Sequence, residues 1–175
     1  MRYVGLMVID PSDLGALEAY KLATSLIVPR PIAWVGSRSG AGVDNLAPFS
    51  YFMGVSTKPP SIAISVARGR KGVLKDTAAN ILGGFEFTVS VVSFDLARQM
   101  VQTSLPFAAD VSEFEAVDIE LVNAETVGAP RPAHALACME CTLVHAHDMG
   151  STHLFVGEVT RYHLDQSIVR VDNKG

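Results

Sequence analysis

The chain has 175 residues, is 49% hydrophobic and 18% charged, and carries a net charge of −4. This length predicts a single domain over residues 1–175 with enough apolar material for a core, and the acidic balance gives nucleic-acid binding no electrostatic support. The apolar run at residues 3–9 is too short to span a bilayer, and two cysteines without an export signal indicate a reducing, cytoplasmic compartment.

A helix is predicted close to the N-terminus. Ser12 is a candidate N-cap, and apolar residues recur at helical spacing from Leu14 to about Thr24. Residues 27–29 then lead into a strand.

A hairpin follows this helix. Residues 31–37 alternate like a strand, and Gly40 and Gly42 supply the positive φ angles that a tight reversal needs. The return strand opens at Val43 and is expected to break at residues 45–50. At this break an amide, a hydroxyl and backbone N–H groups stand among residues too small to block a planar ligand.

A basic cluster stands between a strand predicted over residues 61–67 and a helix predicted over residues 76–82. Arg68, Arg70 and Lys71 place three cations within four residues of a chain that is acidic overall. The first N–H groups of a helix are free, so this junction would suit an anion such as a phosphate. A solvated turn is the alternative interpretation.

The remaining pattern, alternating strands with a few short helices, is typical of an antiparallel barrel. Residues 85–91 alternate as a half-buried strand, and residues 104–116 are irregular and would form either a lid or a plain surface loop. The other predicted elements are a connection at 53–60, a helix at 93–102, a short turn at 112–115, a strand at 119–122, a break at 130–132, and a long hairpin of residues 135–147 and 152–163.

Two apparent redox or metal motifs are expected to be structural. Cys138 and Cys141 form a C-x-x-C, but residues i and i+3 of a strand face opposite sides, so packing is favoured over pairing or chelation. His145 and His147 share one strand face without an evident third ligand, which favours a solvated face over a metal site.

Five segments in this order resemble the flavin reductase-like FMN-binding family. They are PRPIAWVGS from residue 29, NLAPFSYF from residue 45, the pair Pro59-Pro60, KDTAANI from residue 75 and LFVGEV from residue 154. The resemblance runs from about the first helix to about residue 165. It implies a mainly β fold, an antiparallel split β-barrel with a few short helices at the rim, which binds FMN and forms a homodimer.

The resemblance also implies a reaction, the transfer of hydride from NAD(P)H to FMN, with FAD as a further candidate. Reduced flavin would then leave, or its electrons would pass to a monooxygenase or another acceptor. The difficult chemistry belongs to the flavin, so the lack of an acid–base signature does not count against an enzyme. The spacing of Gly36, Gly40 and Gly42 does not match the G-x-G-x-x-G of a Rossmann dinucleotide domain.

By the same resemblance, one group of residues would line the flavin ring and ribityl chain and another would hold the phosphate. The ring group is Ser37, Asn45, Ala47, Pro48 and Ser50. The phosphate group is Ser65, Arg68, Lys71, Lys75 and Thr77. His153 would lie on the nicotinamide side, and Gly157 within the following strand indicates a bulge or the close approach of a ligand or another backbone.

Two alternatives to the reductase stay open. One is a flavoredoxin-like electron carrier that holds FMN without accepting hydride from nicotinamide, and the other is an enzyme similar to pyridoxamine-phosphate oxidase. Similar proteins continue into a segment like Arg-Leu-Gly-Gly-x-Tyr that helps to close the site. This sequence reaches Gly175 without it, so we expect the cover of the site to come from elsewhere or from a longer form of the chain.

Overall fold

The computed structural model describes residues 5–171, which group into two compact units divided between Arg30 and Pro31. The smaller unit holds a 3-10 turn, Pro11–Asp13, and the helix α1, Ala16–Leu26. The predicted N-cap at Ser12 is wrong, because the carboxylate of Asp10 accepts the Ser12 N–H and caps the 3-10 turn instead. α1 begins later, after Gly15.

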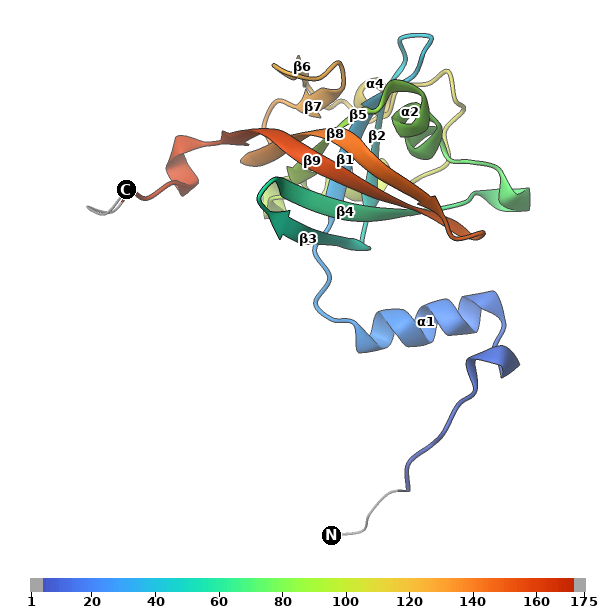
Figure 1. Ribbon diagram of the computed structural model, residues 1–175. Coiled ribbons are helices and arrows are strands. Elements are labelled where there is room, and N and C mark those ends of the chain that lie inside the picture. The colour runs from blue at the N-terminus through green and yellow to red at the C-terminus, as the bar shows by residue number, and fades with distance from the viewer. Residues whose placement is uncertain (1–4, 172–175) are drawn as a thin grey trace. The chain divides into compact units, whose positions relative to one another are not determined.

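The larger unit is built on a seven-stranded antiparallel sheet with the strand order β2-β1-β5-β8-β9-β4-β3 and a two-stranded sheet, β6-β7. Figure 1 shows α2 and α4 beside the ends of β1 and β2. The architecture confirms a mainly β fold with short peripheral helices. The strands are β1 Ala33–Arg38, β2 Asp44–Phe49, β3 Phe52–Thr57, β4 Pro60–Ala67, β5 Glu86–Val91, β6 Leu121–Asn123, β7 Pro130–Pro132, β8 Ala137–Asp148 and β9 Thr152–Leu164. The helices are α2 Asp76–Gly84, α3 Ala97–Gln102 and α4 Glu113–Ala116, with 3-10 turns at Arg70–Gly72, Phe94–Leu96 and Gln166–Ile168.

The predicted break at residues 45–50 is a strand for most of its length. β2 pairs with β1 from Asp44 through Phe49, and Pro48 lies within the paired region. A proline cannot donate to a ladder, but β2 is the edge strand of the sheet, so one side of Pro48 needs no partner. The predicted connection at 53–60 and the predicted break at 130–132 were wrong for the same reason, since they contain the edge strand β3 and the short strand β7.

The core has two parts, and the second of them determines where the site lies. The main cluster is built around Phe87 and Phe155 inside the large sheet and includes Ile81 of α2. A second cluster forms around Trp34, whose Nε1 donates a hydrogen bond to Thr103 Oγ1 at 2.9 Å. This cluster fastens the segment around residues 103–121 beside β1 and β2.

β5 is buried on both faces, whereas the sequence predicts one buried face. Thr88 and Ser90, on the face opposite Phe87 and Val89, are also fully buried. Thr88 Oγ1 donates a hydrogen bond of 2.6 Å to the Pro130 carbonyl, so the strand that contains Pro130 covers the second face of β5.

The two cysteines are both buried and free. The predicted alternation is confirmed, because β8 pairs with β5 without a shift and sets Cys138 opposite Ser90 and Cys141 opposite Phe87, on the two faces of the sheet. Both thiols are buried because both faces are covered at this point. Cys141 is a member of the main core cluster, which confirms its predicted packing role. Burial raises the pKa of both thiols, so neither is a ready nucleophile.

Gly36→Ala is expected to destabilise the larger unit by about 3 kcal/mol or more, as overpacking of a tight core does. A Cβ at Gly36 would lie 2.1 Å from the Pro130 carbonyl oxygen and 2.5 Å from Thr88 Oγ1. Chemical unfolding measures the loss. Gly54→Ala is the matched control, because a Cβ on this strand glycine meets nothing within 4 Å. Equal stability of the two variants would contradict the packing of β7 on β1.

Candidate functional site

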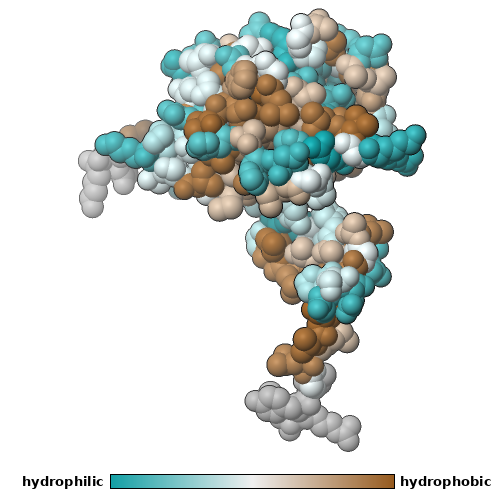
Figure 2. Space-filling view, turned by 45° about the vertical axis from the view of Figure 1, so that its right-hand side comes forward, coloured by the Kyte–Doolittle hydropathy of each residue, from teal (hydrophilic) through white to brown (hydrophobic). Residues whose placement is uncertain are grey.

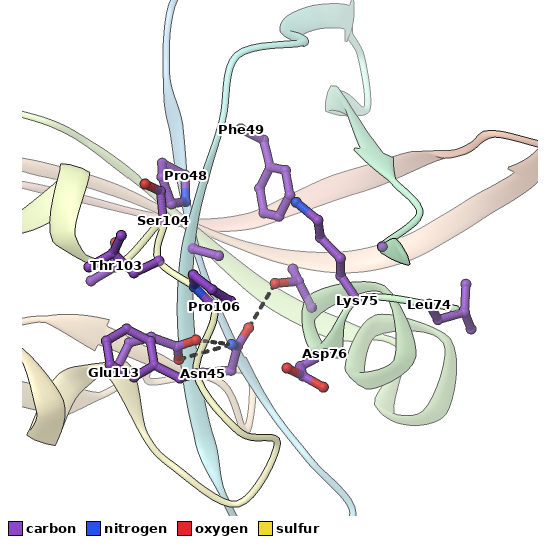
Figure 3. A pocket seen from close by; sticks show the side chains of 15 residues that line it. Asn45, Pro48, Phe49, Leu74, Lys75, Asp76, Thr103, Ser104, Pro106 and Glu113 are labelled. Atoms are coloured by element: carbon purple, nitrogen blue, oxygen red, sulfur yellow. Dashed lines mark hydrogen bonds between the residues drawn. The ribbon is translucent and has the colours of Figure 1, made fainter. Parts of the chain in front are cut away.

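A cavity of about 300 Å³ opens between β2, the start of α2 and the segment 103–107. Figure 3 shows this pocket, with Asn45 and Phe49 on β2, Lys75 and Asp76 at the start of α2, and Glu113 at one end. The second core cluster holds the third wall in place through Trp34 and Thr103.

The cavity brings together five of the residues predicted to bind a cofactor. They are Asn45, Ala47, Pro48, Lys75 and Thr77. The first three come from β2, and the last two come from the N-terminal end of α2, which the turn after β4 brings against β2. The predicted ring group and phosphate group therefore meet at one site, each represented by part of its members.

Lys75 gives the cavity a cationic end. It is the N-cap residue of α2 and makes no side-chain capping hydrogen bond. Its Nζ lies 5.9 Å from the centroid of the Phe49 ring, and Figure 3 shows the side chain extending toward that ring. Free backbone N–H groups and a lysine at the start of a helix together suit an anion.

The other predicted residues do not line this cavity in the described part of the chain. Ser37 is buried at the end of β1, behind Asn45, and Ser50 is half-buried just after β2. Ser65 is half-buried on β4, where its N–H donates to the Tyr51 carbonyl at 2.9 Å. Lys71 is exposed in the 3-10 turn before α2.

Arg68 holds the loop before α2 in place through three hydrogen bonds. Its Nε donates to the Gly150 carbonyl at 2.8 Å, and its two terminal nitrogens donate to the Gly72 carbonyl at 3.1 Å and to Asp148 Oδ2 at 2.7 Å. The guanidinium thus ties the loop before α2 to the turn between β8 and β9. A hydrogen bond from the Gly150 N–H and the Arg68 charge lower the pKa of Asp148, which keeps this contact ionic.

His153 lies at the start of β9, outside the lining of the cavity among the residues described. It is 8% exposed and stacks on Phe155 with ring centroids 5.8 Å apart. Its Nε2 is 3.9 Å from Asp148 Oδ2, and its buried Nδ1 has no hydrogen-bond partner in the described chain. Gly157 makes room for a core side chain, since a Cβ there would lie 2.5 Å from Phe87 Cζ.

Glu113 is the site residue that the sequence did not indicate. It is 6% exposed, and Asn45 Nδ2 lies 3.0 and 2.9 Å from its two carboxylate oxygens. The Leu46 N–H donates to Oε2 at 2.9 Å. Burial raises the pKa of Glu113, and these hydrogen bonds oppose that rise. The sequence signal is faint, because a glutamate in the first turn of a short helix ordinarily faces solvent.

Asn45 joins Glu113 to the start of α2. Its Oδ1 accepts hydrogen bonds from Thr77 Oγ1 at 2.7 Å and from Ser37 Oγ at 3.2 Å. Ser37 Oγ in turn accepts from Asn80 Nδ2 at 3.1 Å. A chain of buried polar groups therefore runs behind the cavity and connects three of its walls.

His145 and His147 are exposed on β8. Across residues 5–171, no three His, Cys, Asp or Glu side chains come together in a group that could hold a metal ion. Within the same residues, no helix has the length and apolar character needed to cross a membrane.

Comparison with known proteins bears on this site. The family model described as Flavin reductase like domain matches residues 25–170. An uncharacterized protein of Deinococcus radiodurans is 40% identical over 154 residues, which cover 84% of this chain and 68% of the relative.

Solved structures of known proteins share the fold. Nitrilotriacetate monooxygenase component B from Bacillus cereus matches with a TM-score of 0.90 at 31% identity, over 95% of this chain and 85% of that chain. A protein with a split barrel domain from Shewanella frigidimarina matches with a TM-score of 0.79 at 21% identity, over 92% of this chain and 80% of that chain. These matches confirm the split-barrel fold that the sequence resemblance implies.

Proposed function

The chain belongs to the flavin reductase-like family, and we propose that it binds FMN in the β2–α2 cavity and transfers hydride from NAD(P)H to the flavin. The observation that carries this proposal is that one wall of the cavity is apolar while another part suits an anion. Small side chains of β2, Ala47 and Pro48, line one wall, and Lys75 stands at the free N-terminus of α2. A flat apolar wall beside an anion site is what a planar ring with a phosphate tail requires.

When bound, FMN supplies the ring that accepts hydride, so the protein provides position and electrostatics. Ala47 and Pro48 would face the ring, and Lys75 would pair with the phosphate. FAD is a second candidate cofactor, since the cavity is open at the surface. Arg68 holds the loop before α2 in place through Gly72 and Asp148, so we assign it a supporting role in phosphate binding.

We further propose a homodimer that passes electrons to a second protein. Hydrophobic side chains gather on the face of the larger unit in Figure 2, and Met53 and Val55 of the edge strand β3 are 61% and 46% exposed. Contiguous exposed apolar surface marks an interface. The similar Bacillus cereus protein is component B of a monooxygenase, which makes a monooxygenase the first acceptor to test. Light scattering of the purified protein measures the subunit number.

Lys75→Ala is expected to weaken FMN about tenfold and to leave riboflavin unchanged, because only FMN has a phosphate. A charge-assisted hydrogen bond contributes about 1.5–3 kcal/mol, and an exposed lysine belongs at the low end of that range. Titration of flavin fluorescence measures both affinities. Lys58→Ala is the control, since Lys58 is an exposed lysine outside the cavity. Equal losses for FMN and riboflavin would place the phosphate elsewhere.

Anaerobic reduction tests the proposed function itself. We expect FMN-loaded protein to lose its yellow colour within seconds of the addition of NADH or NADPH. His153→Ala is expected to slow this step without releasing FMN if His153 lies on the nicotinamide side. Protein that stays yellow with both nucleotides but is bleached by dithionite would be an electron carrier, and the reductase proposal would be wrong.

A further inference from the structure

The hydrogen bonds that link the buried polar side chains behind the cavity have fixed donors and acceptors. The Leu46 N–H is a backbone donor, so Glu113 Oε2 must accept from it. Both carboxylate oxygens also accept from the Asn45 NH₂, at 3.0 and 2.9 Å, so the amide oxygen of Asn45 faces the other side. Glu113 thereby sets the orientation of Asn45.

The orientation of Asn45 determines what Thr77 can offer to a ligand. Asn45 Oδ1 only accepts, so the Thr77 hydroxyl must donate its single proton to it, over 2.7 Å. Ser37 donates to the same oxygen at 3.2 Å. With its proton used, the Thr77 hydroxyl has only lone pairs left for the cavity that it lines. A phosphate, which at neutral pH mainly accepts, gains nothing from such a group.

We propose that Glu113 is a specificity-determining residue that, through Asn45, makes the Thr77 hydroxyl a hydrogen-bond acceptor for a hydroxyl of the ligand's sugar-alcohol chain and leaves that side chain no proton to donate to a phosphate. The inference rests on the proposed flavin binding and adds the orientation of the ligand. Thr77 lies two residues from Lys75, so the part of the ligand next to the phosphate meets it. The phosphate itself belongs to Lys75.

Three flavins separate the possible roles of Thr77. FMN has the sugar-alcohol chain and the phosphate, riboflavin has only the chain, and lumiflavin has neither. Thr77→Val is expected to weaken FMN and riboflavin equally, by about tenfold, and to leave lumiflavin unchanged. Thr77→Ser restores the hydroxyl and is expected to restore both affinities. Valine matches threonine in shape, and Asn45 keeps its bond from Ser37, so the variant is expected to fold, which thermal unfolding checks.

A loss confined to FMN would show that Thr77 donates to the phosphate and would overturn the inference. An equal change in affinity for all three flavins, or no change, would mean that Thr77 only packs in the fold, and it would overturn the inference as well. Failure of all three flavins to bind the unaltered protein would reject the proposed function along with the inference.

Glu113→Gln tests whether Glu113 sets the orientation of the Asn45 amide and, through it, the acceptor role of Thr77. The glutamine can accept from Leu46 and donate to Asn45, so the Asn45 amide can turn over and free the Thr77 proton. Inorganic phosphate is then expected to compete with riboflavin in this variant and to leave riboflavin binding by the unaltered protein unchanged. Equal competition in both proteins, or competition in neither, would overturn the role of Glu113.

Discussion

Ala47→Phe is expected to lower flavin affinity at least a hundredfold while the protein stays folded. Ala47 lies on the cavity side of β2 and is only partly buried. The cavity has about 300 Å³ of space, so a phenyl ring can extend into it and would then occupy the place of the ligand. Fluorescence titration measures the affinity, and thermal unfolding confirms the fold.

Ala146→Phe is the matched control for this change. Ala146 is an exposed residue of β8 outside the cavity lining, and the same substitution there is expected to leave flavin binding unchanged. A folded Ala47→Phe variant that binds flavin normally would mean that the ring lies elsewhere. Loss of binding in both variants would point to a general effect of added aromatic surface.

The turn and first strand of the hairpin could be predicted because their causes are local. Gly42 has a φ of 85°, as a tight reversal demands, whereas the positive φ predicted for Gly40 is wrong. β1 follows the predicted alternation, since Ala33 and Val35 pack in the main core cluster and Trp34 in the second. The continuation of β2 through Pro48 could not be predicted in this way. A proline is tolerated there because β2 is an edge strand, and a strand's place in a sheet depends on the whole fold.

The candidate site was also predicted only in part. The predicted Asn45, Ala47, Pro48, Lys75 and Thr77 lie together because α2 packs beside β1 and β2, a long-range contact that the family resemblance implied and no local pattern showed. Partners distant in the chain account for what was missed. The role of Arg68 depends on Asp148 and that of Asn45 on Glu113, and no local pattern relates such pairs.

Glu140 is a second buried carboxylate, and it lies within the C-x-x-C segment of β8. It is fully buried. Its oxygens accept the N–H groups of Glu125 at 2.7 Å and Thr126 at 2.6 Å, the Thr126 hydroxyl, and a hydrogen bond from His163 Nε2. Burial raises the pKa of Glu140, but these hydrogen bonds outweigh it and lower the pKa to about 2. Glu140 therefore pins the loop before β7 to the large sheet in its ionised form.

Glu140→Gln is expected to lower the free energy of unfolding at pH 7 by about 3 kcal/mol. The folded pKa of about 2 lies below the ordinary value of 4.5, so the ionised side chain stabilises the protein fully above about pH 4.5. This contribution declines as the pH falls toward 2, because the carboxylate must then be protonated. The neutral glutamine also sets an NH₂ group against the donors that face Glu140.

The difference between the two proteins is therefore expected to depend on pH. Urea unfolding at pH 7 and at several values between 4.5 and 2.5 measures it, and the gap in unfolding free energy should narrow as the solution is acidified. Glu115→Gln is the control, because Glu115 is an exposed glutamate of α4, and its removal is expected to change neither the stability at pH 7 nor its slope. A gap for Glu140→Gln that stays constant down to pH 2.5 would mean that lost packing, and not the charge held by Thr126 and His163, accounts for the effect.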